Sequence, residues 1–289
     1  MRLRLGLALV VGLAGRILAE PASCDRLGQE MRGLTGLVAP PSGIEDGWCV
    51  LDGARTGGEG LRITVERLRV RGEVVQDRLT RVSLVAKGLR ARPALDDRDM
   101  PDWLRDAMRL QSAEVHLILA RDEAADRLRL EFGQVMLSGG AEAVVLAEVA
   151  GAEIAPDALL RGRLTRLQVQ WTNDGRTLRP VMEAGGARLQ PGATGDAAVL
   201  ATRSLLQALV AAMPEASLQA ADARALEAFI RAMPQGRGQL VVNVRLDEGI
   251  GAVELGLLAL ASDPTGPEAL ARLFAGTTVS VKWKPGFPP

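Results

Sequence analysis

His116 is the only histidine among the 289 residues, so it is the first residue to consider as a metal ligand or general base. It lies between Val115 and Leu117, and this alternation places the imidazole on the polar face of a β-strand. The sequence has no second histidine for a multi-histidine metal site, and no GxSxG or SxxK motif stands near a plausible partner. The sequence therefore predicts a surface histidine on a strand, without a catalytic or metal-binding role.

Acidic clusters are the second source of possible chemistry. The run Asp96–Asp99 looks like a calcium loop, but it lacks the glycine and the closing glutamate of an EF-hand, so we expect it to cap a helix that begins near Pro101. The pairs Asp122-Glu123 and Asp247-Glu248 have the residue types of a general acid and base, yet both lie in predicted hairpin turns, where carboxylates stay solvated. We therefore predict no enzyme activity, no metal site and no cofactor.

Cys24 and Cys49 are the only cysteines. Two cysteines in an exported protein most often form a disulfide, and closing a loop of 24 intervening residues should stabilise the fold by roughly 3 kcal/mol. The alternative is lipid attachment at Cys24, which would make the protein a lipoprotein anchored through that residue. Ala22-Ser23 fits the motif for this attachment, whereas Pro21 stands where the motif has leucine.

The first 19 residues have the three parts of a secretory signal peptide. Two arginines form a positive start, Leu5–Ala14 is an uncharged apolar stretch, and cleavage is predicted between Ala19 and Glu20. Arg16 interrupts the apolar run, which argues against the alternative of a membrane anchor. We expect an exported, periplasmic protein with no transmembrane segment in its mature chain.

The charge balance narrows the range of partners. The chain carries 35 basic and 35 acidic side chains, and without residues 1–19 the balance is 32 to 35, a formal charge of −3. Nucleic-acid-binding domains are usually strongly basic, so we expect no nucleic-acid partner. The apolar fraction of 47% is sufficient for a packed core.

The strands that would position these residues follow from hydrophobic periodicity. Apolar and polar residues alternate in stretches between residues 61 and 190, and the alternation slips in phase at Glu66-Arg67 and near Gly88. Such slips are typical of bulges in half-exposed antiparallel strands. Asn173-Asp174-Gly175 predicts a hairpin turn, with a strand returning over 178–182.

Helical patterns lie outside these strands. Residues 24–37 have one apolar face, and residues 205–213 and 226–233 have apolar stripes that end at Pro214 and Pro234. We predict an α+β fold, in which several amphipathic helices pack on one face of a curved, mainly antiparallel sheet. The predicted divisions are a cleaved segment 1–19, a disulfide-linked helical segment 20–60, a β-rich half 61–190, and a helix pair with a second β-rich half over 191–289, with residues 20–289 forming one continuous domain.

Shifting the chain by 125 residues superimposes two similar units. The strand 115–119 falls on 240–244, the pair Asp122-Glu123 falls on Asp247-Glu248, and the strand 128–132 falls on 253–257. Two explanations stay open: a two-fold internal duplication, or the periodicity that any two helix–hairpin units share.

The stretches 61–75, 127–149 and 239–260 consist of alternating, phase-slipping strands in a chain with an export signal. In this pattern the chain resembles proteobacterial periplasmic β-rich proteins of the AsmA-like and LptA-like type. The resemblance implies a curved sheet whose apolar inner face holds lipid chains. It rests on pattern alone and implies no particular functional residue.

Two functions are therefore expected for a non-enzymatic envelope protein. The first is the binding or transport of a lipid or another amphiphile, in a groove lined by the apolar face of the sheet and by Leu205, Leu209, Phe229 and Ile230. The alternative is a structural or interaction module that binds envelope proteins, in which the same residues form a closed core. An open apolar groove distinguishes the first function from the second.

Overall fold

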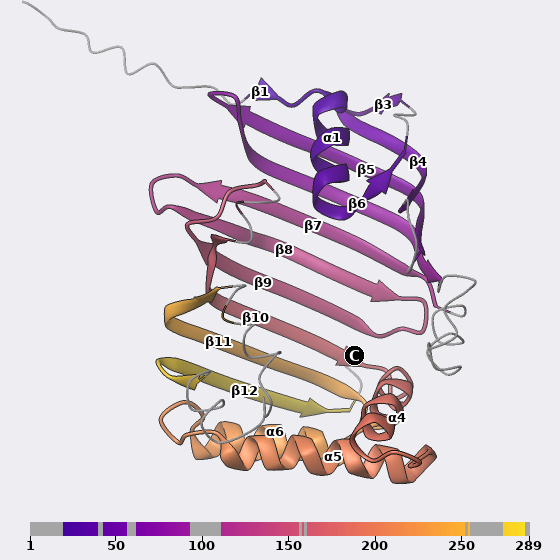
Figure 1. Cartoon of the computed structure of the whole chain (residues 1–289), viewed down its shortest axis with the longest axis vertical. Helices are drawn as coiled ribbons and strands as arrows, with labels where there is room; N and C mark the ends of the chain where they lie inside the picture. Colours follow the sequence, from indigo (N-terminus) through magenta and orange to yellow (C-terminus); the bar gives the residue numbers. More distant parts are fainter. Residues whose placement is uncertain are drawn as a thin grey trace, which may run out of the picture.

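The computed structural model describes residues 20–39, 43–56, 62–92, 111–155, 158, 161–251, 254 and 274–286. Within these ranges the chain forms one large antiparallel sheet of 12 strands, accompanied by four helices (Figure 1). The predicted signal segment, the acidic run Asp96–Asp99, the helix near Pro101 and, except for Glu254, the strand 253–257 lie outside the described residues. The duplication at an offset of 125 residues therefore stays a prediction.

The strands follow one another along the chain with few interruptions. They are β1 (Glu20–Pro21), β2 (Leu37–Val38), β3 (Gly43–Glu45), β4 (Trp48–Thr56), β5 (Arg62–Val75), β6 (Arg78–Arg92), β7 (Ala113–Asp122), β8 (Arg127–Leu137), β9 (Glu142–Ala150), β10 (Arg163–Asn173), β11 (Gly238–Gly251) and β12 (Thr277–Pro285). The helices are α1 (Cys24–Thr35), α4 (Leu178–Leu189), α5 (Gly195–Ala212) and α6 (Ala220–Ala232).

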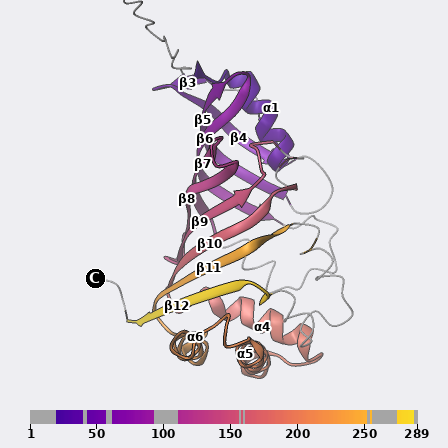
Figure 2. The same ribbon diagram turned by 90° about the vertical axis from the view of Figure 1, so that its left-hand side faces the viewer.

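The sheet is a meander in which each strand from β4 to β12 pairs with its neighbour in the sequence. The full order is β12-β11-β10-β9-β8-β7-β6-β5-β4-β2, with β1 on β5 and β3 on β4. Figure 2 shows the strands rotating progressively from one end of the sheet to the other, as the right-handed twist of strands requires. The predicted antiparallel sheet with accompanying helices is thus confirmed.

Both predicted phase slips are visible in the sheet. In β5 the buried residues Val65 and Leu68 are three positions apart, where regular alternation would give two or four. In β6 the pairing with β7 shifts between Ala86 and Leu89, around Gly88 at a φ of +63°. A side chain at Gly88 would meet the carboxylate of Glu66, so glycine is needed at this irregularity.

Two expectations about turns are wrong. After Asn173 the chain enters helix α4 instead of returning as a strand, because the Asp174 carboxylate accepts hydrogen bonds from the backbone N–H groups of Arg176 (2.9 Å) and Thr177 (3.0 Å). Burial alone would raise the pKa of Asp174, but these hydrogen bonds lower it below its ordinary value. The pair Asp247-Glu248 lies within strand β11 and not in a turn.

The described helices pack at the two ends of the sheet (Figures 1 and 2). Helix α1 contacts β2, β4 and β5, and its Leu27 is only 2% exposed. The predicted disulfide between Cys24 and Cys49 is confirmed and joins α1 to β4. At the other end α6 contacts β12, while α5 contacts both α4 and α6. Each end has its own cluster of buried apolar side chains.

Candidate functional site

One face of the sheet is apolar from β4 to β12. Because strand pairing brings side chains of the same face into register, the pairs define rows that cross the whole sheet. The first row consists of Cys49, Val70, Leu84, Leu117, Gly133, Val145, Val169, Val242 and Val281.

Two more rows flank the first on the same face. The second row consists of Leu51, Leu68, Ala86, Val115, Val135, Ala143, Trp171, Leu240 and Trp283, and the third consists of Gly72, Val82, Leu119, Leu130, Ala147, Leu167, Val244 and Val279. We call these three rows the apolar face.

Burial along the apolar face differs between the ends and the centre. At the ends, where the helices pack, Val70 is 0% exposed and Val281 is 4% exposed. In the centre, Leu117, Val145 and Val169 of the same row are only half-buried. Every residue of β9 is half-buried, whereas a strand that covers a closed core alternates between buried and exposed positions. The central strands thus have an apolar face that is incompletely sealed.

The opposite face carries His116, which is half-buried. This residue pairs with Val85 and Gln134, and its ring meets that of Phe132 edge-on with centroids 5.0 Å apart. Among the described residues, no group of three or more His, Cys, Asp or Glu side chains could hold a metal ion.

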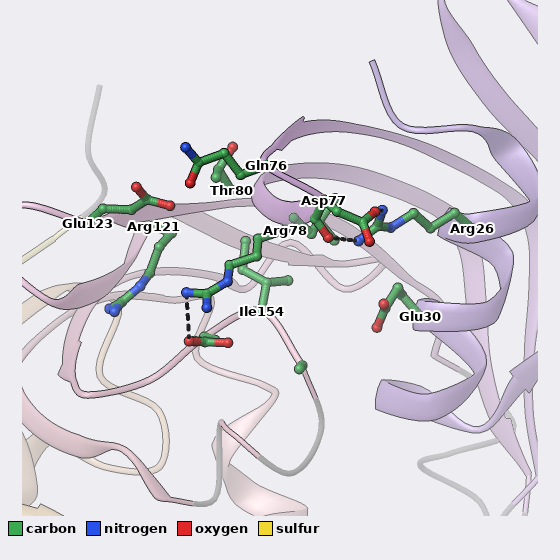
Figure 3. Close-up of a pocket in the computed structure, with 12 residues that line it drawn as sticks. Arg26, Glu30, Gln76, Asp77, Arg78, Thr80, Arg121, Glu123 and Ile154 are labelled. Atoms are coloured by element: carbon green, nitrogen blue, oxygen red, sulfur yellow. Dashed lines mark hydrogen bonds and ion pairs between the residues drawn. The ribbon is translucent and has the colours of Figure 1, made fainter. Parts of the chain in front are cut away.

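A polar cleft opens at one edge of the apolar face (Figure 3). Its volume is about 500 Å³, and helix α1, the β5–β6 turn, the adjoining end of β7 and the loop after β9 form its walls. Leu79 and Ile154, which line the cleft, also belong to the buried cluster beneath α1. The cleft is therefore continuous with the apolar interior at the α1 end of the sheet.

Charged side chains of both signs line this cleft. Arg26 donates to the Asp77 carboxylate at 2.6 Å, and Arg78 lies 3.7 Å from Glu153. Each pair has at least one largely exposed partner, so each contributes at most about 1 kcal/mol. A third arginine, Arg121, is more deeply placed, with its side chain only 12% exposed.

The four residues predicted to line a groove lie on α5 and α6, and the groove itself stays a prediction. Phe229 and Ile230 of α6 are buried, with 6% and 2% exposure, in the cluster beneath the C-terminal helices. Helix α5 contributes Leu206 to the edge of that cluster, whereas Leu205 and Leu209 are half-buried outside it. Phe229 also meets Trp283 edge-on, with ring centroids 4.9 Å apart.

The sequence reasoning missed Arg121 and the cleft. The cleft consists of turns and loops from distant parts of the chain, which periodicity does not bring together. The position of Arg121 on the apolar side of its strand could have been predicted, because Arg121 continues the two-residue alternation of Val115, Leu117 and Leu119. An arginine in step with an apolar stripe marks a charge on the buried side of a strand.

The remaining predicted positions lie near the N-terminus. Glu20 belongs to β1, where it pairs with Val74 of β5, and Ala19 lies outside the described residues. No described helix is both long enough and apolar enough to span a membrane. The chain matches no protein-family model, and a search of the curated proteins returned no match.

Proposed function

We propose that this protein is a non-enzymatic component of the cell envelope that binds the acyl chain of a lipid or another amphiphile on the central part of its apolar face. The observation that carries the proposal is the half-burial of nearly all apolar-face residues across β7–β10, between two ends where Leu68, Val70 and Val281 of the same rows are buried. An acyl chain laid along these rows would remove their apolar surface from water. Burial of each CH₂ group contributes about 0.8 kcal/mol.

The residue types of the central rows favour an aliphatic ligand. They are mostly valine, leucine and alanine, with Trp171 as the one aromatic residue in the three rows between β7 and β10. The aliphatic side chains have no hydrogen-bonding groups that would select a polar ligand, and the indole N–H of Trp171 is buried without a partner among the described residues. Small residues such as Ala143 and Ala147 lie among the larger side chains of these rows.

We further infer that the helices pack on the one apolar face and close the two ends of this binding surface. Leu27 of α1 shares a buried cluster with Leu68 and Val70, while Ile230 of α6 shares one with Leu240 and Val281. The register places these four strand residues in the rows of the same face. Curved sheets whose apolar inner face holds lipid chains are what the resemblance to AsmA-like and LptA-like proteins implies.

Two features support an exported location. The disulfide between Cys24 and Cys49 is the kind of bond that persists in oxidising compartments such as the bacterial periplasm. The first 19 residues have the pattern of a signal peptide.

The second candidate function is that of an envelope interaction module without a ligand. The burial of Phe229 and Ile230 favours it, because these residues form closed core where a groove was predicted. In this case the half-buried central rows would contact a partner protein instead of a lipid.

Two neighbouring valines of β9 allow a matched test. Val145 lies on the apolar face, whereas Val144 lies on the opposite face, and both are half-buried. The probe is n-dodecyl maltoside below its micelle concentration, with binding measured by calorimetry on protein purified from a bacterial periplasm and stripped of bound lipid. We expect Val145→Asp to abolish binding of dodecyl maltoside, because it places a charge where the dodecyl chain would lie. Val144→Asp should retain binding.

Native mass spectrometry of the unstripped protein provides the second readout. We expect a bound amphiphile in the wild-type protein and none in Val145→Asp. If the wild-type protein carries no amphiphile and does not bind dodecyl maltoside, lipid binding is excluded and the interaction module becomes the better account.

A further inference from the structure

Arg121 occupies an unusual position in the sheet. Beside the three apolar rows lies a fourth row on the same face, which consists of Arg121, Leu128, Val149, Leu164 and Ile250. Within these four rows of described residues, Arg121 is the only charged side chain. Its guanidinium therefore lies at the edge of the apolar face. An acyl chain bound across β7–β10 would end at this edge.

The guanidinium of Arg121 is incompletely satisfied. One nitrogen, Nη2, donates to the carboxylate of Asp126, which is 73% exposed. The other, Nη1, is buried and has no hydrogen-bond partner among the described residues. A buried charged donor without a partner is costly, so such a group in a native structure requires an explanation. An anionic group that enters from the cleft would supply the missing acceptor.

The surroundings of Arg121 limit the charge of that group. The arginines that line the cleft are Arg26, Arg78 and Arg121, and the carboxylates are those of Glu30, Asp77, Glu123 and Glu153. Three cations against four anions exclude a strong positive field, so the cleft would repel a polyanion. A group with a single anionic charge can still bind Arg121 directly, because the planar guanidinium matches a carboxylate or phosphate in two-point contact.

We propose that Arg121 binds the anionic head group, a carboxylate or a phosphate, of an amphiphile whose acyl chain lies on the central apolar face. This proposal rests on the lipid-binding function above and adds the charge selectivity of the same site. Figure 3 shows Arg121 and Arg78 among the side chains that line the cleft. Arg78, which is 70% exposed, would then lie near the outer side of the bound head group.

Arg129 is a matched control for Arg121. It belongs to the same β7–β8 hairpin and pairs with a carboxylate, that of Asp122, at 2.9 Å. It pairs across the strands with Ala120, next to Arg121, and therefore points to the opposite face. Arg121→Gln and Arg129→Gln remove the same charge from the same hairpin, but only the first removes it from the apolar face.

The test compares ligands that share a dodecyl chain and differ in their head groups. Dodecanoate, dodecyl phosphate and dodecyl maltoside are titrated by calorimetry into wild-type protein and both variants, with folding checked by thermal unfolding. We expect Arg121→Gln to weaken binding of at least one anionic ligand about tenfold and to leave dodecyl maltoside unchanged. Arg129→Gln should leave all three unchanged. The difference in affinity between dodecanoate and dodecyl phosphate shows whether the site prefers a carboxylate or a phosphate head group.

Asp126→Asn provides a test that leaves Arg121 in place. Asp126 competes for the guanidinium, so its neutralisation should strengthen binding of the preferred anionic ligand in a protein that folds normally. The proposal is overturned if Arg121→Gln affects charged and neutral ligands equally, or, where that variant does not fold, if Asp126→Asn leaves anion binding unchanged. Failure of all three ligands to bind wild-type protein would instead overturn the lipid-binding function itself.

Discussion

The ends of the sheet and its centre have the same apolar rows but differ in how deeply these rows are buried. At one end helix α1 packs on the strands and is joined to β4 by a disulfide. At the other end α6 packs on β12, and α5 contacts both α4 and α6. Between them, β9 has no fully buried residue. An apolar stripe on a strand therefore specifies which face turns away from water, but not how deeply each part of that face is buried.

The two sealed ends also differ in how their helices are held. Helix α1 has 12 residues, its Leu27 lies deep in the core, and the disulfide is a second attachment of the helix to the sheet. Helices α4 and α5 instead approach each other closely, because Gly186 of α4 lies against the backbone of Ala198 in α5. One end thus depends on a covalent bond and the other on backbone proximity.

Removal of the disulfide should have the largest effect. We expect the double substitution Cys24→Ser and Cys49→Ser to lower the free energy of unfolding by roughly 3 kcal/mol, because the unfolded chain gains the freedom of an open loop. Urea denaturation of both proteins measures the difference, and wild-type protein treated with a reductant should match the variant. A loss below about 1 kcal/mol would mean that packing of Leu27 suffices to hold α1.

Gly186→Ala should have the next largest effect. A Cβ atom at this position would lie 1.8 Å from the carbonyl oxygen of Ala198, so α4 and α5 must move apart. We expect a loss of about 2 kcal/mol in thermal or urea unfolding. Gly185→Ala is the control: its Cβ would lie 3.0 Å from the Thr202 hydroxyl, and alanine gains about 1 kcal/mol in helix propensity over glycine. Equal losses in the two variants would contradict close backbone packing between these helices.

Much of the sheet was predictable from the sequence because alternation is a local signal. The strands around 61–75, 115–119 and 240–246 lie where the period of two places them, and the slip near Gly88 appears as a shift in register. The disulfide was predictable because the chain has only two cysteines.

The errors arose where local signals compete. Asn173-Asp174-Gly175 suits a hairpin turn, but Asp174 also accepts the first backbone N–H groups of a following segment, and that segment became α4. Which members of the α5 stripe pack against the core could not be predicted, because a stripe alone does not distinguish them. Leu206 packs against the core cluster, whereas Leu205 and Leu209 do not. The cleft at Arg121 depends on tertiary contacts that no periodicity encodes.

The smallest predicted effect tests the contrast between the ends and the centre within a single row. Val70 and Val145 lie on the same face and in the same row, but Val70 is completely buried and Val145 is half-buried. Substitution of either by alanine removes the same two methyl groups and lowers the intrinsic preference for β-structure equally.

We expect Val70→Ala to cost about 2 kcal/mol and Val145→Ala less than about 1 kcal/mol in urea denaturation of lipid-free protein, because the cost of lost methyl groups rises with the contacts they had. If a lipid occupies the centre, the cost of Val145→Ala should increase in protein saturated with dodecyl maltoside, while that of Val70→Ala should not change. Equal costs at both positions in lipid-free protein would show that the centre is packed as tightly as the ends. The binding surface proposed for β7–β10 would then not exist.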